Sequence, residues 1–230
     1  MKYQREAAFL KDQLGSYGVS LMRNACVAGG AVTSVFSSSS INDFDLFFTS
    51  QKHLDNALKS APRNDKTVET DSALSIVSEG RRLQLVKVVL GTPSEIINKF
   101  DFTICEGAFH LEEGFCFGTN FLEHLAQRRL VFNLTAEYPI CSLYRAVKFI
   151  KRGFHLSGID AIKLGLRIQS LKIDTYAELR KQLMGIDTLF LKDLVDALKG
   201  QETKKYDLNE FLSLLESWLE KLDVLVGQEG

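Results

Sequence analysis

Two aspartates alternate with large apolar side chains in the hexapeptide Asp43-Phe44-Asp45-Leu46-Phe47-Phe48. Alternation with a period of two is typical of a β-strand that has one buried face. Because successive side chains of a strand point to opposite faces, Phe44, Leu46 and Phe48 share one face, and Asp43 and Asp45 emerge side by side on the other. The sequence therefore predicts a strand that presents two carboxylates on one surface.

The carboxylates of Asp43 and Asp45 are costly neighbours unless a cation lies between them, because like charges at this distance repel. Hard oxygen ligands suit Mg²⁺, which keeps several waters and takes further oxygens from substrate phosphates. We therefore expect Asp43 and Asp45 to bind Mg²⁺, with Mn²⁺ as the alternative ion. A nucleoside triphosphate is the expected partner.

A pair of glycines, Gly29-Gly30, follows the apolar run from Ala25 to Ala28 and precedes a segment, Val32 to Phe36, that can begin a helix. Residues without a Cβ atom let backbone N–H groups approach phosphate oxygens closely at such a turn. Twelve residues separate Gly30 from Asp43. The order strand, glycine turn, helix and acidic strand predicts a nucleotide site with Gly29 and Gly30 on the phosphates.

This arrangement resembles the polymerase-β-like nucleotidyltransferase superfamily, whose signature is Gly-Gly or Gly-Ser, a short helix and an Asp-x-Asp strand. The segment Ala28-Gly29-Gly30-Ala31-Val32 is most similar to the head domain of CCA-adding and poly(A) polymerase enzymes. The segment Asp101-Phe102-Thr103-Ile104 is similar to the Asp-Phe-Thr-Ile-Asn segment of the same branch. The resemblance covers roughly residues 20–110.

The resemblance implies transfer of a nucleoside monophosphate from a triphosphate to a hydroxyl, with the 3′ end of an RNA such as tRNA as the first acceptor expected. It implies two divalent ions held by Asp43 and Asp45, with Asp101 as a catalytic residue that binds the metal at the side of the nucleophile or accepts the hydroxyl proton. The hydroxyls of Ser37 and Ser38 would flank the triphosphate. Transfer to a protein, a small molecule or a second nucleotide is an alternative, and so is a catalytically silent binding module.

The sequence departs from the branch at several positions. Thr33-Ser34 stands where the tRNA-modifying enzymes usually carry Arg-Asp, and Cys105 replaces the expected Asn. At the place of a third acid on a later strand the chain has Gln84, which cannot be a charged ligand or a base. We take Asp101 as the substitute for that acid, followed by Glu69 and Asp71.

Basic residues gather in one segment although the formal net charge of the chain is only −1. Arg145, Lys148 and Arg152 are three and four residues apart, so they share one face of a predicted helix. They could bind the phosphates of the nucleotide or of an acceptor RNA. The rings of Tyr144 and Phe149 could stack on a base.

The pattern along the chain predicts an α+β fold, in which a mixed β-sheet flanked by helices precedes a helical domain. We expect a nucleotidyltransferase domain over residues 1–130 and a helical domain over 131–230. Helices are predicted at residues 4–14, 49–58, 95–99, 140–152, 158–172, 174–184, 187–199 and 207–226, and strands at 66–77, 81–90 and 100–109.

Hydrophobic residues make up 45% of the 230 residues, an ordinary value for a globular protein. No apolar run approaches the ~20 residues that span a bilayer, and the charged N-terminal segment lacks the apolar core of a signal peptide. We therefore expect a cytoplasmic protein. The amphipathic C-terminal helix is a candidate surface for a protein partner.

Overall fold

The computed structural model describes residues 2–183, 198 and 200–226, without the side chains of 218–226. The chain forms two compact units, one of residues 1–136 and 149–163 and the other of residues 137–148 and 164–230. These units alternate along the sequence, whereas the predicted division at residue 130 is contiguous. That division into two domains stays a prediction.

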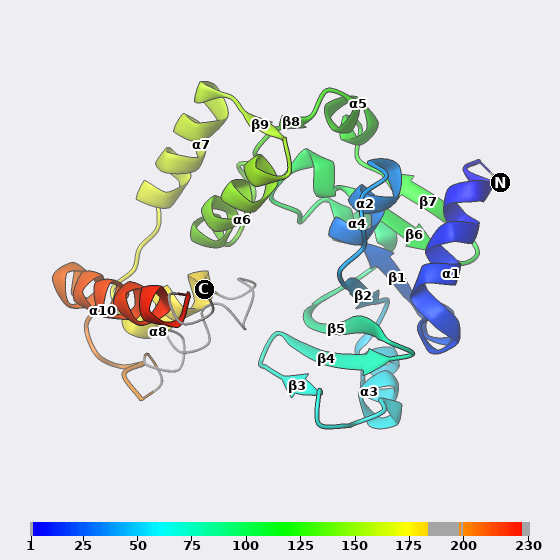
Figure 1. The fold of residues 1–230 in the computed structure, drawn as a ribbon, viewed down its shortest axis with the longest axis horizontal. Coiled ribbons are helices and arrows are strands. Elements are labelled where there is room, and N and C mark those ends of the chain that lie inside the picture. Colours follow the sequence, from blue (N-terminus) through cyan, green and yellow to red (C-terminus); the bar gives the residue numbers. More distant parts are fainter. Residues whose placement is uncertain (1, 184–197, 199, 227–230) are drawn as a thin grey trace. The chain divides into compact units, whose positions relative to one another are not determined.

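A seven-stranded sheet in the order β3-β4-β5-β2-β1-β6-β7 forms the centre of the first unit (Figure 1). Within this sheet, as the structure describes it, β2 and β5 pair in parallel and the other neighbouring strands pair antiparallel. The strands are β1 (Ala25–Ala28), β2 (Phe44–Phe48), β3 (Val68–Glu69), β4 (Ala73–Ser78), β5 (Arg81–Leu90), β6 (Gly107–His110) and β7 (Gly114–Phe117). The predicted mixed sheet is confirmed.

Helices flank this sheet, as predicted. In sequence order they are α1 (Gln4–Leu21), α2 (Gly30–Phe36), α3 (Gln51–Ser60), α4 (Pro93–Ile97) and α5 (Phe121–Ala126). Figure 1 shows α3 beside the β4–β5 side of the sheet, where it contacts β5 and β2. A two-stranded sheet of β8 (Arg129–Leu130) and β9 (His155–Leu156) also belongs to the first unit.

Helix α4 covers part of the sheet face on which the aspartates lie. Its start is fixed by a capping box, in which Thr92 and Glu95 exchange hydrogen bonds, and Pro93 occupies the first turn. Ile96 and Ile97 pack on Cys26, Ala28, Phe47 and Ala108. Burial in this apolar cluster raises the pKa of the Cys26 thiol to about 12, so that thiol is neutral and unreactive.

The second unit is helical in its described residues. Helices α6 (Pro139–Lys151) and α7 (Gly158–Gln169) are each shared with the first unit, and α8 (Tyr176–Gln182) and α10 (Leu208–Val226) belong to the second. Its core is apolar and is made by Cys141, Tyr176, Leu179, Leu183, Leu198 and Phe211. The helical part that follows the sheet is thus confirmed. The predicted helix at 187–199 falls almost wholly outside the described residues.

Three predicted elements differ from the structure. The predicted strand at 66–77 is two antiparallel strands, β3 and β4, because the chain turns at residues 70–72. Helix α1 continues to Leu21 across a kink at Gly15, whose φ of 77° interrupts the helix without ending it. The predicted strand at 100–109 is wrong for most of its length, because Thr103–Cys105 is a 3₁₀ turn and only Gly107–His110 joins the sheet. No described helix combines the length and the apolar character needed to cross a bilayer.

Candidate functional site

Asp43 and Asp45 lie at the edge of the sheet where β1 ends and β2 begins. Asp45 pairs with Ala28 of β1, the residue directly before Gly29, and Asp43 immediately precedes β2. Phe44 and Leu46 are 3% and 0% exposed, so their burial fixes the register that turns both aspartates to the opposite face. The predicted side-by-side carboxylates are therefore at the expected place, next to the glycine turn.

The two glycines at the end of β1 have different roles. Gly29 has φ 74° and ψ −130°, and a Cβ atom there would lie 3.0 Å from the Phe100 ring. Its N–H donates to the Gly107 carbonyl at 2.9 Å. Gly30 begins α2, and a Cβ atom on it would meet nothing within 4 Å. Gly29 thus makes the turn, and Gly30 leaves open space over the start of the helix.

Gln84 contacts the aspartate pair from the neighbouring strand. It pairs with Asp45 in the parallel β2–β5 ladder, and its Nε2 donates to Asp43 Oδ2 at 3.1 Å. This hydrogen bond fixes the orientation of the Asp43 carboxylate. The position at which a third acid was expected therefore holds a neutral amide that donates a hydrogen bond to Asp43.

Replacing Gln84 with Glu should make the stability of the protein depend on magnesium. Three carboxylates would then meet, and we expect a loss of about 1 kcal/mol without metal, since like charges on paired strands destabilise a sheet. Mg²⁺ should restore more stability to Gln84→Glu than it adds to the wild type, because an ion that binds the native state stabilises it. Thermal unfolding with and without Mg²⁺ tests this, with the exposed Gln169→Glu as control. Equal magnesium responses in all three proteins would contradict it.

The other acids proposed as a third ligand do not join the pair. Within the described part of the chain, no three His, Cys, Asp or Glu side chains come together where they could hold a metal ion. Asp101 follows α4, and its carbonyl accepts from the Asn133 N–H at 2.8 Å. Glu69 pairs instead with Lys87 and Arg63, which lower its pKa to about 2. The catalytic role of Asp101 stays a prediction.

Asp43 and Asp45 nonetheless suit a magnesium ion. They are two half-buried hard-oxygen donors on one sheet face. A two-carboxylate set leaves coordination positions for waters and substrate oxygens, which is how Mg²⁺ is usually held beside phosphates. The donor chemistry fits the predicted ion, with Mn²⁺ as the alternative.

The predicted phosphate-binding residues are spread more widely than the aspartates. Ser37 and Ser38 follow the last turn of α2, roughly 10 Å along the helix from Gly30. Arg152 donates from Nη2 to Ser34 Oγ of α2 at 3.3 Å, so it does reach the helix that follows the glycine turn. Arg145 and Lys148 belong to the second unit. Nucleotide contacts by these residues stay predictions.

Glu106 is a polar residue of this sheet edge that the sequence reasoning missed. It is half-buried, directly precedes Gly107, and accepts from Asn133 Nδ2 at 2.7 Å. The same amide donates to the Phe100 carbonyl at 2.8 Å. Burial raises the pKa of Glu106, and the bond from Asn133 offsets that rise in part. A single acid in the apolar run from Phe102 to Phe109 was the signal that could have identified it.

Glu106→Gln should gain stability relative to the wild type as the pH rises. The pKa of Glu106 is raised in the folded protein. Its protonated side chain therefore contributes fully to the free energy of unfolding below about pH 4.5, and this contribution is lost as the pH rises through the folded pKa. Glutamine resembles the protonated form and does not titrate. Urea unfolding from about pH 4 to pH 7 tests this, with exposed Glu112→Gln as the charge-matched control. A difference that shrinks with rising pH would contradict it.

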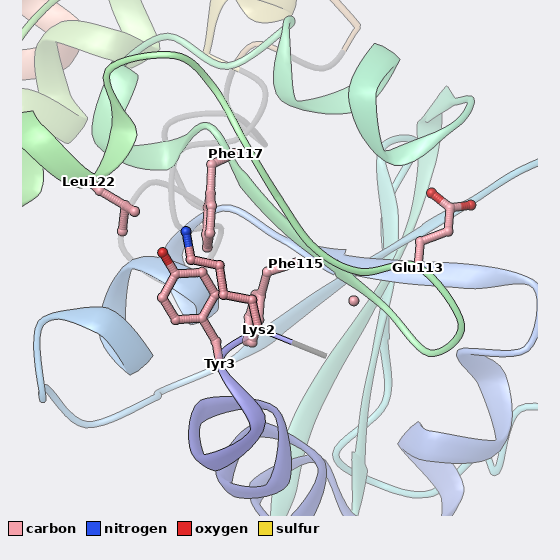
Figure 2. A pocket seen from close by; sticks show the side chains of 7 residues that line it. Lys2, Tyr3, Glu113, Phe115, Phe117 and Leu122 are labelled. Atoms are coloured by element: carbon pink, nitrogen blue, oxygen red, sulfur yellow. The ribbon is translucent and has the colours of Figure 1, made fainter.

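Two pockets lie near β7, and neither includes the aspartates. Figure 2 shows the first, about 270 Å³ in volume, where the rings of Tyr3, Phe115 and Phe117 gather while Glu113 extends away from them. Its lining is mostly apolar, and Tyr3 also packs edge-on against Phe36. The second, about 430 Å³, is polar and contains Glu106.

The fold is similar to that of solved CCA-adding enzymes. The Thermotoga maritima CCA-adding enzyme complexed with tRNA gives a TM-score of 0.54 at 16% identity, over 92% of this chain and 53% of that one. A CCA-adding enzyme in complex with ATP gives 0.56 at 18% identity, over 78% and 49%. A complex with CTP gives 0.55 at 16%, over 92% and 54%. This confirms the predicted α+β fold, in which a mixed sheet flanked by helices precedes a helical part.

Sequence comparison points to a more specific group. "Gabija anti-defense 2" of Bacillus phage SPbetaL7 is 36% identical over 192 residues, which are 81% of this chain and 48% of that protein. The chain thus spans about half the length of the curated relative that it matches. The family described as Gad2, Gabija anti-defense 2 family protein, matches residues 3–128, which include both glycines and both aspartates. The chain therefore belongs to the Gabija anti-defense 2 family.

Proposed function

We propose that this chain is a metal-dependent nucleotidyltransferase, which moves a nucleoside monophosphate from a nucleoside triphosphate to a hydroxyl acceptor. One observation carries the proposal. Asp45 lies opposite Ala28, so that two carboxylates on one sheet face stand beside a glycine turn that opens a helix. Carboxylates for a divalent ion and a backbone that phosphates can approach are the two requirements of this chemistry.

The reaction divides into steps that separate residues support. Asp43 and Asp45 would hold the two divalent ions, which would lower the pKa of the attacking hydroxyl and offset charge on the triphosphate. Gly30 would admit the phosphates to the N-terminus of α2. The acceptor oxygen bonds to the α-phosphorus while the bond to the β-phosphate oxygen breaks, releasing pyrophosphate and a proton. Gln84 keeps Asp43 oriented through its 3.1 Å hydrogen bond.

The 3′ end of an RNA is the acceptor that we propose first. The solved enzymes of similar fold include one complexed with tRNA, and the basic residues Arg145, Lys148 and Arg152 offer phosphate ligands. The relative's name assigns it a role against Gabija. We extend that role to this chain, with nucleotidyl transfer as the means. A protein, a small molecule or a second nucleotide would be an alternative acceptor within the same chemistry.

Transfer of label from each α-³²P nucleoside triphosphate to candidate acceptors tests the proposal. Purified wild type should label an acceptor in the presence of Mg²⁺ or Mn²⁺ and not after chelation, and denaturing gels separate labelled RNA from labelled protein. Label on a protein would mean that the chain is a nucleotidyltransferase whose acceptor is a protein and not an RNA. Absence of any metal-dependent transfer, to any acceptor and from all four triphosphates, would overturn the proposal.

A catalytically silent module is the second candidate, favoured by the neutral Gln84 at the place of a third acid. In that case the fold holds a partner, with the C-terminal helices as its surface. A double variant with Asp43→Ala and Asp45→Ala separates the two candidates. If it kept both the anti-defence phenotype and the affinity for magnesium nucleotide, the silent module would be the better account.

A further inference from the structure

A polar pocket lies on the same edge of the sheet as the glycine turn. Its volume of about 430 Å³ is within the range of small-molecule sites. Amides, hydroxyls and one carboxyl line it, among them Asn98, Thr103, Glu106, Thr119, Asn120 and Asn133. A lining of this kind suits a ligand with several hydrogen-bonding groups and little net charge.

The sheet places this pocket within reach of the aspartates. Asp45 pairs with Ala28, and Ala28 pairs with Ala108, so two strand spacings, about 10 Å, separate Asp45 from Ala108. Glu106 lies two residues before Ala108, toward the edge at which Gly29 donates to Gly107. Ala108 and Ala28 lie on the sheet face of Asp45. The glycine turn and the pocket are therefore neighbours at this edge of the sheet, at a spacing on the scale of a nucleotide.

The carboxyl of Glu106 is held in a fixed place. Asn133 donates to its Oε1, and a Cβ atom on Gly118 would clash with its Oε2. The backbone of Gly118 does not have a positive φ, so its conformation does not require glycine. What requires glycine at this position is the space that the Glu106 carboxyl occupies. Asn133 also binds the carbonyls of Phe100 and Asp101. Glu106 is thus tied to the segment that packs on Gly29.

We propose that this pocket takes the nucleoside part of the nucleotide substrate, with the Glu106 carboxyl accepting a hydrogen bond from a ribose hydroxyl or a base amino group. The inference rests on the proposed nucleotidyl transfer and names Glu106 as a residue that determines which nucleotide binds. The triphosphate would lie at Gly30 and the aspartates, and the nucleoside would extend toward β6 and β7.

Binding of two magnesium-loaded probes, a nucleoside triphosphate and inorganic tripolyphosphate, tests this by calorimetry. Glu106→Ala should weaken the affinity for the preferred nucleoside triphosphate by about 10-fold to 100-fold, as expected when a hydrogen bond to a charged group is lost. Its affinity for tripolyphosphate should not change, because that probe has no nucleoside. Exposed Glu112→Ala is the control and should leave both affinities unchanged.

A second variant guards against misfolding. Asn120 makes no side-chain cap to α5, so Asn120→Ala removes an amide of the pocket without removing a cap. It should reduce nucleotide affinity in the same selective way. Two further probes distinguish the ribose from the base as the partner of Glu106: a 2′-deoxy triphosphate, and a triphosphate whose base has no exocyclic amino group. The probe that lacks the group bound by Glu106 should have the same affinity for the wild type and for Glu106→Ala.

Failure of this inference differs from failure of the reaction. If Glu106→Ala and Asn120→Ala bound the nucleoside triphosphate as tightly as the wild type, the pocket proposal would be overturned, although metal-dependent transfer could still be measured. If the wild type bound nucleoside triphosphate no more tightly than tripolyphosphate, the nucleoside would have no subsite and the proposal would also fail.

Discussion

Asp45→Asn is expected to lower the rate of nucleotidyl transfer by about 10³-fold, the scale on which removing one group that stabilises transition-state charge acts. Asparagine keeps the shape of the side chain and loses the charge that would hold the divalent ion. Asp45 is half-buried, and it lies on β2 between the buried residues Phe44 and Leu46. The exchange should therefore leave the sheet intact and remove the metal-dependent rate.

Single-turnover transfer at saturating nucleotide measures this effect, since it separates the chemical step from binding. Asp65→Asn is the matched control, because Asp65 is exposed in the loop before β3 and lies in no predicted site. Asp43→Asn should follow Asp45→Asn, and circular dichroism should show that both variants fold. A variant of Asp45 that kept the wild-type rate would remove the aspartate pair from the mechanism.

The central part of the site was predictable because its determinants are local. The glycine turn, the short helix and the acidic strand fall between Ala25 and Phe48. Alternation along β2 orients Asp43 and Asp45, and a glycine pair after an apolar strand is a turn signal by itself. The pairing of Asp45 with Ala28 needs only that β2 turns back antiparallel to β1, as it does.

The contacts of Gln84 and Glu106 could not be predicted in the same way, because they join segments far apart in the sequence. Gln84 meets Asp43 across 41 residues, through the parallel pairing of β2 with β5. Glu106 is held by Asn133 across 27 residues. The hydrophobic pattern of a sequence indicates which face of the sheet a side chain lies on. Which residue it contacts on that face depends on the order of the strands, which the pattern does not give.

The wrong strand at 100–109 shows tertiary contacts overriding local preference. Its β-branched and aromatic residues favour a strand. Yet Phe102 forms an isolated bridge with Phe132, and the Thr103 hydroxyl hydrogen-bonds to buried His124 at 2.8 Å. These contacts hold Thr103–Cys105 in a 3₁₀ turn, and the sheet resumes at Gly107. That interruption is also what turns Glu106 into the polar pocket.

Alanine at Gly29 and at Gly30 should have opposite consequences, although the two glycines are adjacent. Gly29→Ala should destabilise the fold by about 2–3 kcal/mol, because φ 74° is strained for any residue with a Cβ atom and the new methyl would press on the Phe100 ring 3.0 Å away. A fall in Tm of roughly 5–10 °C would follow. Gly30→Ala meets no such obstacle, and alanine favours the helix that Gly30 begins by up to about 1 kcal/mol.

The rate of nucleotidyl transfer should be lowered by Gly30→Ala, the variant that keeps its stability. The methyl of Gly30→Ala occupies the open space over the start of α2, where a phosphate would approach the backbone, so we expect transfer to fall about tenfold with an unchanged or higher Tm. Thermal unfolding and single-turnover transfer on both variants separate the two roles. Full transfer by Gly30→Ala would exclude this turn as the phosphate site, and a wild-type Tm for Gly29→Ala would mean that the backbone at Gly29 relaxes to a conformation open to other residues.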